Sequence, residues 1–306
     1  MNWSLFAVQV LNSVQLGALL FLLSAGLTLV FGIMSFLNLA HGSLYMTGAY
    51  VGAVATARSG SFLVGVALAL LFNLVLGLLI ERAFLGKLYR CSHLDQVLCT
   101  FGLILIFNEI VRIIWGPSPM FVELPEALGA TIRLFGQNYP LYRFLIIVAA
   151  LAVAAGLYVL INRTRLGMLI RAGAFNAEMI SVLGVNMRLL NTAVFAGGAA
   201  LAGLAGILMG PLTAVQPGMG EPVLILTLVV IIVGGVGSIR GALYGALIVG
   251  VVDTVGRVYM QIGLREVFDR PIAQAVGPAL ASMLIYILMA IVLAVKPEGL
   301  FPVKHG

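Results

Sequence analysis

Residues 14–34 read V-Q-L-G-A-L-L-F-L-L-S-A-G-L-T-L-V-F-G-I-M and contain no charged side chain. They lie within the first 57 residues, a region without a single Lys, Arg, Asp or Glu. A helix that crosses a membrane needs about 20 predominantly apolar residues. A cleavable signal peptide would begin with a positively charged segment, which this region lacks. We therefore expect the N-terminal run to remain in the protein as a membrane segment.

The whole chain shares this apolar composition. Of its 306 residues, 62% are hydrophobic and only 9% are charged, and the mean hydropathy is +1.14. Soluble domains are about 25% charged, so a soluble enzyme, a disordered chain and a nucleic-acid-binding protein are poor fits. The net charge of +6 reflects few acidic residues. We expect the positive charge to face membrane lipid, in particular an anionic inner leaflet. We expect no nucleic-acid partner.

Charged residues gather between long apolar runs, which is typical of a polytopic helical membrane protein. The predicted fold class is all-α, a transmembrane helical bundle with eight or nine membrane segments in a single domain over residues 1–306. Two segments, 223–239 and 241–256, are short and rich in glycine, and we interpret them as half-helices, a re-entrant pair or full crossings. The approximate segments are 14–34, 36–57, 61–81, 96–116, 141–162, 189–213, 223–239, 241–256 and 271–295.

The distribution of basic residues predicts the orientation in the membrane. The loops at 82–95 and 163–188 are rich in Lys and Arg, which favours the cytoplasmic side. The C-terminal tail, with Lys296 and Lys304, is expected on the same side. The proline-rich segment 117–140 is expected on the periplasmic side, and the side of the N-terminus stays open.

Sequence motifs for catalysis are absent. The chain has no G-x-x-x-x-G-K-[ST] phosphate loop, no H-E-x-x-H and no G-x-S-x-G. Its three histidines are too few for a multi-histidine metal centre, and Cys91 and Cys99 lie in or near a predicted cytoplasmic loop, where a disulfide is not expected. We predict no catalytic residue, no metal site and no enzyme activity, and favour passage of a solute through the chain.

One polar stretch lies inside the charge-free region, at residues 31–50. Asn38, His41, Ser43 and Tyr45 supply hydrogen-bonding groups there, and polar groups at membrane depth need partners or a water-filled cavity. The stretch is either a broken helix that lines a substrate path or a tight contact between helices. On the first interpretation these four residues line the path.

A second stretch, 234–250, is rich in glycine. Gly237, Gly241 and Gly245 fall at i, i+4 and i+8, a doubled G-x-x-x-G ridge that allows close helix packing. Arg240 interrupts the ridge, which indicates a helix end at an interface.

The two stretches share a short internal sequence similarity. Residues 41–45 read H-G-S-L-Y and residues 240–244 read R-G-A-L-Y. Transporters often contain internal repeats with interrupted helices at corresponding places. A true repeat and a chance similarity both remain possible interpretations.

The loop at 163–188 is long enough for a short helix, which we predict over Ala174–Leu183 with Gly184 at its C-terminal cap. Asn176 and Glu178 would lie near its start. Such a helix either lies on the lipid surface or binds a soluble cytoplasmic partner.

Charged residues within the predicted membrane segments form two pairs. Glu109 and Arg112 are three residues apart, and Asp253 and Arg257 are four apart. Neighbours at these spacings meet on one helix face, so we predict structural ion pairs. The alternative is a stand-alone secondary transporter that uses Glu109 or Asp253 as its ion-coupling site; a membrane enzyme or scaffold is less favoured.

Taken together, these stretches resemble the permease subunits of branched-chain amino-acid ABC importers of the LivH type. The resemblance runs over nearly the whole chain in the expected order. The matching runs are N-L-A-H-G-S-L-Y-M-T-G-A-Y at 38–50, T-F-G-L-I-L-I-F-N-E-I-V-R-I-I-W-G at 100–116, R-T-R-L-G-M-L-I-R-A at 163–172, V-L-G-V-N at 182–186, G-G-V-G-S-I-R-G-A-L-Y-G-A at 234–246 and K-P-E-G-L-F at 296–301.

The resemblance implies a partner set. A second related permease would complete the pore in the bacterial inner membrane, two cytoplasmic ATPase subunits would hydrolyse ATP, and a periplasmic substrate-binding protein would deliver the substrate. The chain itself would carry no cofactor. The coupling loop would be Arg171–Asn186, with Arg171, Asn176, Glu178, Leu183 and Gly184 as its key residues. Glu178 is the only acidic residue between Arg165 and Arg188, fewer than is common in the family.

The substrate implied by the resemblance is leucine, isoleucine or valine. Other members carry different amino acids, urea or short amides. The predicted path has neutral polar groups without an obvious fixed charge, which suits a zwitterion or a neutral amide.

Overall fold

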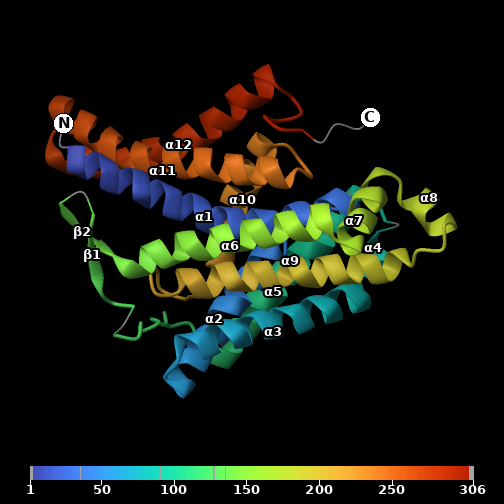
Figure 1. Cartoon of the computed structure of the whole chain (residues 1–306). Helices are drawn as coiled ribbons and strands as arrows, with labels where there is room; N and C mark the ends of the chain where they lie inside the picture. The colour runs from blue at the N-terminus through green and yellow to red at the C-terminus, as the bar shows by residue number, and fades with distance from the viewer. Residues whose placement is uncertain (1–2, 35, 90, 127, 135, 303–306) are drawn as a thin grey trace.

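The structure, a computed structural model, describes residues 3–34, 36–89, 91–126, 128–134 and 136–302. It is a helical bundle with one small β-hairpin (Figure 1). The elements are α1 (Trp3–Met34), α2 (His41–Ser59), α3 (Phe62–Ile80), the π-helix η1 (Glu81–Leu85), α4 (Gly86–Leu88), α5 (His93–Trp115), β1 (Thr131–Leu134), β2 (Gln137–Pro140), α6 (Leu141–Arg163), α7 (Arg165–Phe175), α8 (Ala177–Val182), α9 (Met187–Met209), α10 (Gly220–Gly234), α11 (Ile239–Val267) and α12 (Arg270–Val295).

Seven helices of the described chain are long and apolar enough to cross a membrane. They are α1, α3 with its continuation to Leu88, α5, α6, α9, α11 and α12. The two remaining predicted segments correspond to α2, whose residues are smaller and more polar, and to α10, which has only 15 residues. The predicted polytopic helical bundle is therefore confirmed.

Two predictions about the elements need correction. The segment 241–256 is not a half-helix, because α11 has 29 residues and continues to Val267. Asp253 and Arg257, which were placed near the end of the predicted segment, form an ion pair of 2.8 Å within this helix, which allows it to continue past them. The expectation of helices alone also missed the hairpin, in which Ile132 of β1 pairs with Tyr139 of β2.

Helix α1 forms the centre of the bundle. It packs against α9 and α11, and most of its apolar length is buried. Glycines permit these contacts: a Cβ on Gly17 would lie 2.9 Å from the carbonyl oxygen of Ala246, and one on Gly26 would lie 2.7 Å from that of Gly198. Small residues allow close helix contact where the apolar solvent gives no hydrophobic driving force.

The two ends of the bundle differ in structure. The β-hairpin and the start of α1 lie at one end, and α4, α7 and α8 lie at the other (Figure 1). The basic loops 82–95 and 163–188 are thus at the same end, and segment 117–140 is at the opposite end, in the relative order that was predicted. Lys304 lies outside the described residues.

Candidate functional site

The polar stretch at 38–45 lies at the start of α2, inside the bundle. Asn38 and His41 are buried, with 1% and 0% exposure. The Asn38 side-chain oxygen accepts a hydrogen bond from the backbone N–H of Ala40 at 3.0 Å, and the His41 ring donates to the carbonyl oxygen of Leu23 at 3.2 Å. Leu23 lies eleven residues before Met34, the last residue of α1, a distance of about 16 Å along a helix. The chain therefore turns back into the bundle before α2 begins.

The N-terminal ends of α2 and α10 meet at this place. A Cβ on Gly42 would lie 2.5 Å from the carbonyl oxygen of Gly220, the first residue of α10. Two positive helix ends therefore point into the same buried region. Such ends of interrupted helices favour the negative groups of substrates in transporters.

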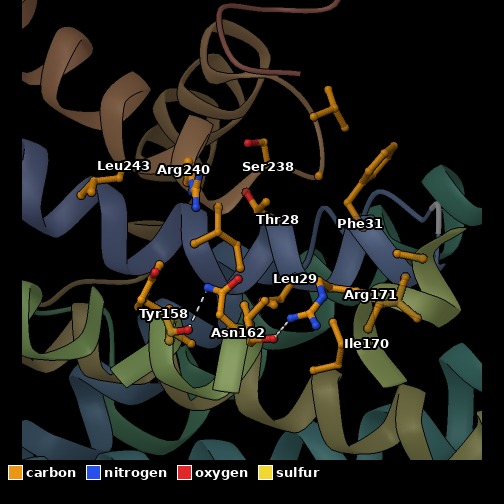
Figure 2. Close-up of a pocket in the computed structure, with 18 of the residues that line it drawn as sticks. Thr28, Leu29, Phe31, Tyr158, Asn162, Ile170, Arg171, Ser238, Arg240 and Leu243 are labelled. Carbon is orange, nitrogen blue, oxygen red and sulfur yellow. Dashed lines mark hydrogen bonds between the residues drawn. The ribbon is translucent and has the colours of Figure 1, made fainter. Parts of the chain in front are cut away.

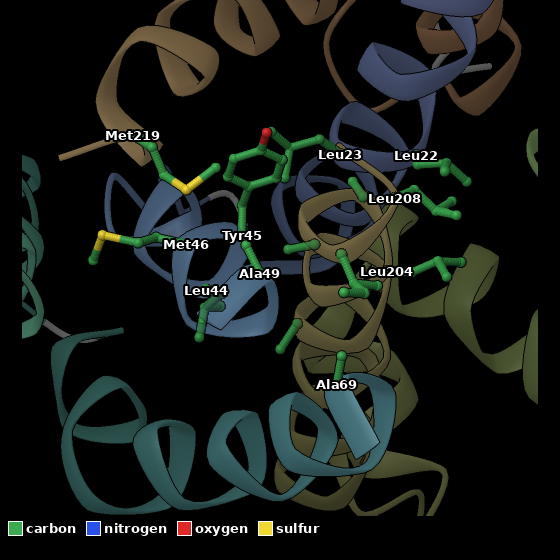
Figure 3. Close-up of a cluster of buried hydrophobic side chains, with 14 of the residues drawn as sticks. Leu22, Leu23, Leu44, Tyr45, Met46, Ala49, Ala69, Leu204, Leu208 and Met219 are labelled. Carbon is green, nitrogen blue, oxygen red and sulfur yellow. The ribbon is translucent and has the colours of Figure 1, made fainter. Parts of the chain in front are cut away.

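Ser43 and Tyr45 are buried beside them, at 4% and 2% exposure. Figure 3 shows Tyr45 close to Met219, within a cluster of α1, α2 and α9 side chains. The structure thus brings Asn38, His41, Ser43 and Tyr45 together at one helix start. In the conformation described here all four are enclosed by protein, and their role in a substrate path stays a prediction.

The loop at 163–188 contains two helices instead of the single predicted one. Helix α7 ends at Phe175, and α8 covers Ala177–Val182. Asn176 separates them: its backbone is extended, and its side-chain oxygen accepts a hydrogen bond from the N–H of Met179 at 2.8 Å. This is an N-terminal cap. An asparagine competes for local backbone donors, and this competition makes the helix begin at Ala177, three residues after the predicted start at Ala174.

Gly184 occupies the predicted cap position after α8. Its φ is +88°, a left-handed value that glycine adopts without steric cost. Its N–H donates to the carbonyl of Ser181, and the N–H of Val185 donates to that of Ile180. These two bonds form a Schellman motif.

Helix α8 contains no buried residue. Met179 is 59% exposed, Val182 is 83% exposed and Leu183 is 72% exposed. An apolar surface on a loop outside the bundle is characteristic of a binding surface. Glu178 lies in the first turn of the same helix, and Arg171 lies on α7, where it donates to the carbonyl oxygen of Ile161.

The glycine-rich stretch has two structural parts. Gly237 lies before α11 with φ of +79°, so the ridge predicted at i, i+4 and i+8 does not include it. Gly241 and Gly245 do lie on α11 and pack closely against α10; a Cβ on Gly245 would lie 2.6 Å from the carbonyl oxygen of Val230. Residues 41–45 and 240–244 both lie at the start of a helix that follows a break, while an internal repeat remains a prediction.

The sequence matches a known family along most of its length. The model of the family described as "Branched-chain amino acid transport system / permease component" matches residues 9–293. The chain belongs to this family.

Individual relatives agree. The chain is 27% identical to BraD of Pseudomonas aeruginosa, a high-affinity branched-chain amino acid transport system permease protein, over 95% of this chain and 94% of the relative. It is 28% identical to LivH of Escherichia coli K12, which has the same description, over 96% and 95% of the two chains. A probable branched-chain amino acid transport permease protein LivH of Methanocaldococcus jannaschii is 29% identical over 79% and 78%. No solved structure shows a significant match.

Three polar contacts between elements of this permease-family chain, each buried or partly buried, were missed from the sequence. The first joins α2 and α3, where the hydroxyl of Thr47 donates to the side-chain oxygen of Asn73 at 3.1 Å. The second joins α5 to the start of α10: Asn108 donates to Glu221 at 2.5 Å and accepts from the N–H of Gly218 at 3.2 Å. Single asparagines in apolar helices were the available signal, since polar groups at membrane depth need partners.

The third contact surrounds Glu81, which is only 3% exposed. The hydroxyl of Tyr89 donates to one of its carboxylate oxygens at 3.1 Å, and the hydroxyl of Thr192 donates to the other at 2.5 Å. Burial and the neighbouring Glu81 carboxylate together raise the pKa of Tyr89 above its usual value. Glu81 lies in a π-helical turn, a feature frequent at functional sites. The cluster joins the end of α3 to the start of α9, which follows the loop at 163–188.

Both predicted ion pairs are present in the structure. Arg112 lies 3.7 Å from Glu109, and both side chains are well exposed. Arg257 lies 2.8 Å from Asp253, whose side chain is 8% exposed. Each carboxylate thus has a basic partner on its own helix.

Proposed function

We propose that the chain is the permease subunit of an ABC importer that carries branched-chain amino acids across the inner membrane of a bacterium. The observation that carries this proposal is the match to the permease family over residues 9–293, together with relatives of nearly equal length. ATP is hydrolysed on separate subunits, and this chain contributes neither an enzyme activity nor a cofactor.

The partners follow from this role. Two permease subunits form the pore, two ATPase subunits bind on the cytoplasmic side, and a periplasmic binding protein delivers the substrate. The exposed apolar residues Met179, Val182 and Leu183 of the coupling loop support an ATPase-binding surface at this end of the bundle. Because loops 82–95 and 163–188 are basic, this end and the C-terminus face the cytoplasm.

The substrate path passes the start of α2 when the bundle opens during transport. Asn38, His41, Ser43 and Tyr45 supply neutral hydrogen-bonding groups there, and the N-terminal ends of α2 and α10 favour a carboxylate. A zwitterionic amino acid meets both requirements.

Reconstitution of the complete importer tests the proposal. The chain is purified with the subunits that accompany it and placed in proteoliposomes with its binding protein, and uptake of radiolabelled leucine, isoleucine and valine is measured. We expect uptake that requires ATP and is abolished by Glu178→Arg, a charge reversal on the coupling loop. Leucine uptake by the chain alone, driven by a proton gradient and lost in Asp253→Asn, would establish a secondary transporter instead. ATP-driven uptake of urea or short amides, without uptake of amino acids, would keep the importer but change its proposed substrate to urea or an amide.

A further inference from the structure

A cavity of about 510 Å³ lies between α1, α6, α7 and the start of α11, at the end of the bundle that holds α7 and α8. Figure 2 shows its labelled side chains, which come from all four helices and from the turn before α11. It is separate from the start of α2, since Asn38, His41, Ser43 and Tyr45 are not among its lining residues. Its size is in the range of ligand-binding cavities.

The lining of the cavity has two chemical parts. The inner wall is apolar and buried, with Phe21 at 1%, Ile170 at 6% and Leu157 at 8% exposure. Two exposed basic residues, Arg171 and Arg240, line it as well. An occupant that fits both parts is an amphiphile with a hydrocarbon portion and an anionic head.

The two arginines have unused binding capacity. Within the described part of the chain, neither has a carboxylate within 4 Å, since the ion pairs there are Glu109–Arg112 and Asp253–Arg257. A guanidinium has five N–H donors, and Arg171 uses its Nη1 group to donate to the backbone carbonyl of Ile161. Guanidinium groups bind phosphate oxygens in a favourable planar geometry. Asn162 is an additional polar residue of the lining, and in the view of Figure 2 its side chain lies between Arg171 and Arg240.

A buried hydroxyl provides an independent observation. Thr28 of α1 lines the cavity and is 1% exposed, and its Oγ1 has no hydrogen-bond partner among the described residues. Buried polar groups without a partner are rare and call for an unseen one. An ester oxygen of a bound lipid would accept a hydrogen bond from this hydroxyl.

We propose that this cavity binds an anionic phospholipid of the surrounding leaflet. Its phosphate lies between Arg171 and Arg240, and one acyl chain lies along Phe21 and Leu157. Basic pockets between membrane helices on the cytoplasmic side bind anionic head groups in this manner. The binding itself does not depend on the proposed transport function.

The site also has a consequence for coupling, and this part rests on the proposed function. Arg171 lies on α7, which leads directly into α8, and Arg240 lies at the start of α11. A lipid held by both arginines links the coupling loop to the bundle. Delipidated importer is therefore expected to hydrolyse ATP with less uptake, and anionic lipid is expected to restore the uptake.

Native mass spectrometry of the full chain tests the binding. The delipidated chain is titrated with phosphatidylglycerol and, in parallel, with phosphatidylcholine of the same acyl chains. We expect preferential retention of phosphatidylglycerol and about 30-fold weaker binding in the double variant Arg171→Gln/Arg240→Gln, since each basic residue near an anionic surface contributes roughly a factor of five. Arg265→Gln, an exposed arginine near the end of α11, is the matched control and should bind as the unmodified chain does.

A steric variant tests the cavity independently of charge. Gly32 lines the cavity, and a Cβ there would make only ordinary contacts, at 3.6 Å from the nearest atom. Gly32→Leu should fill the space and remove bound lipid while the thermal unfolding temperature stays unchanged. Equal retention of both lipids, unchanged binding in the double variant, or competition by inorganic phosphate alone would overturn the proposal.

Discussion

The start of α2 and helix α8 are built from similar residues and have opposite environments. Each has an asparagine that accepts a local backbone hydrogen bond, Asn38 from Ala40 and Asn176 from Met179. Each also has a glycine in a special place. Gly42 is enclosed by α10, whereas Gly184 has no atom outside its own neighbours within 4 Å of a Cβ position. The first glycine supplies space and the second supplies a backbone conformation.

This difference separates two kinds of effect. A change at the start of α2 alters the packing of the bundle, because every neighbour there is protein. A change on α8 leaves the fold intact, because the helix is exposed, and acts only on what binds to it. The following predictions test this separation in order of decreasing effect.

Gly42→Val should cause the largest loss. The new Cβ would lie 2.5 Å from the carbonyl oxygen of Gly220 and 3.1 Å from the Cβ of Leu224, and overpacking of this kind costs about 3 kcal/mol. We expect a sharp fall in the yield of folded chain and in its thermal unfolding temperature in detergent. Gly156→Val is the control, since Gly156 lies on an exposed position of α6 with nothing within 4 Å. Equal stability of the two variants would contradict close packing at the start of α2.

The two asparagines offer a matched pair. Asn38→Ala leaves the N–H of Ala40 buried without its acceptor, which costs about 2 kcal/mol. Asn176→Ala removes the cap of an exposed helix, and water replaces the lost acceptor, so the cost is about 0.5 kcal/mol. Thermal unfolding of both variants measures the difference. If Asn176→Ala were the more destabilising, the assignment of buried and exposed helix starts would be reversed.

Leu183→Arg should leave the fold intact and weaken ATPase binding. Leu183 is 72% exposed, and loss of an apolar anchor at an interface costs about 2 kcal/mol, or roughly 30-fold in affinity. Recovery of ATPase subunits with the affinity-purified chain and leucine uptake should fall together. Leu183→Met is the control that keeps the apolar contact. Full ATPase recovery with Leu183→Arg would show that α8 is not part of the ATPase interface.

Gly184→Ala should weaken ATPase binding less than Leu183→Arg does. A Cβ at a φ of +88° costs about 1 kcal/mol, which loosens the cap of α8 and lowers ATPase affinity by about fivefold. The unfolding temperature of the bundle should not change. Co-purification at limiting ATPase concentration measures this loss of affinity. Gly184→Trp adds bulk on the exposed side and should lower the ATPase affinity further. An unchanged affinity in both variants would show that the partner does not contact this cap.

Much of the helix pattern was predictable, because hydropathy and caps are local properties. The segments 141–162 and 271–295 agree closely with α6 and α12, since charges or prolines mark their ends. The first segment was placed at 14–34 although α1 begins at Trp3, because the polar residues Gln9 and Asn12 hid its first turns. The capping position of Gly184 was predictable because a glycine after a short apolar helix favours a left-handed conformation.

Contacts between distant residues were not predictable in the same way. Glu81 and Thr192 are 111 residues apart, and no local pattern relates a carboxylate at one helix end to a hydroxyl at the start of another. The depth at which α2 begins depends on the His41–Leu23 contact, which only packing against α1 produces.

The sequence by itself determined a membrane protein of many helices, its family and the position of the basic loop at 163–188, because composition, charge distribution and motif order are properties of the linear sequence. Only the tertiary structure decided that the polar residues of 38–45 are enclosed where α2 and α10 meet, that α8 is exposed, and that Arg171 and Arg240 share one cavity. The physical reason is that in a medium as apolar as the side chains themselves, hydropathy does not choose which helix faces meet. Close packing of small residues and pairing of buried polar groups make that choice, and both depend on residues far apart in the chain.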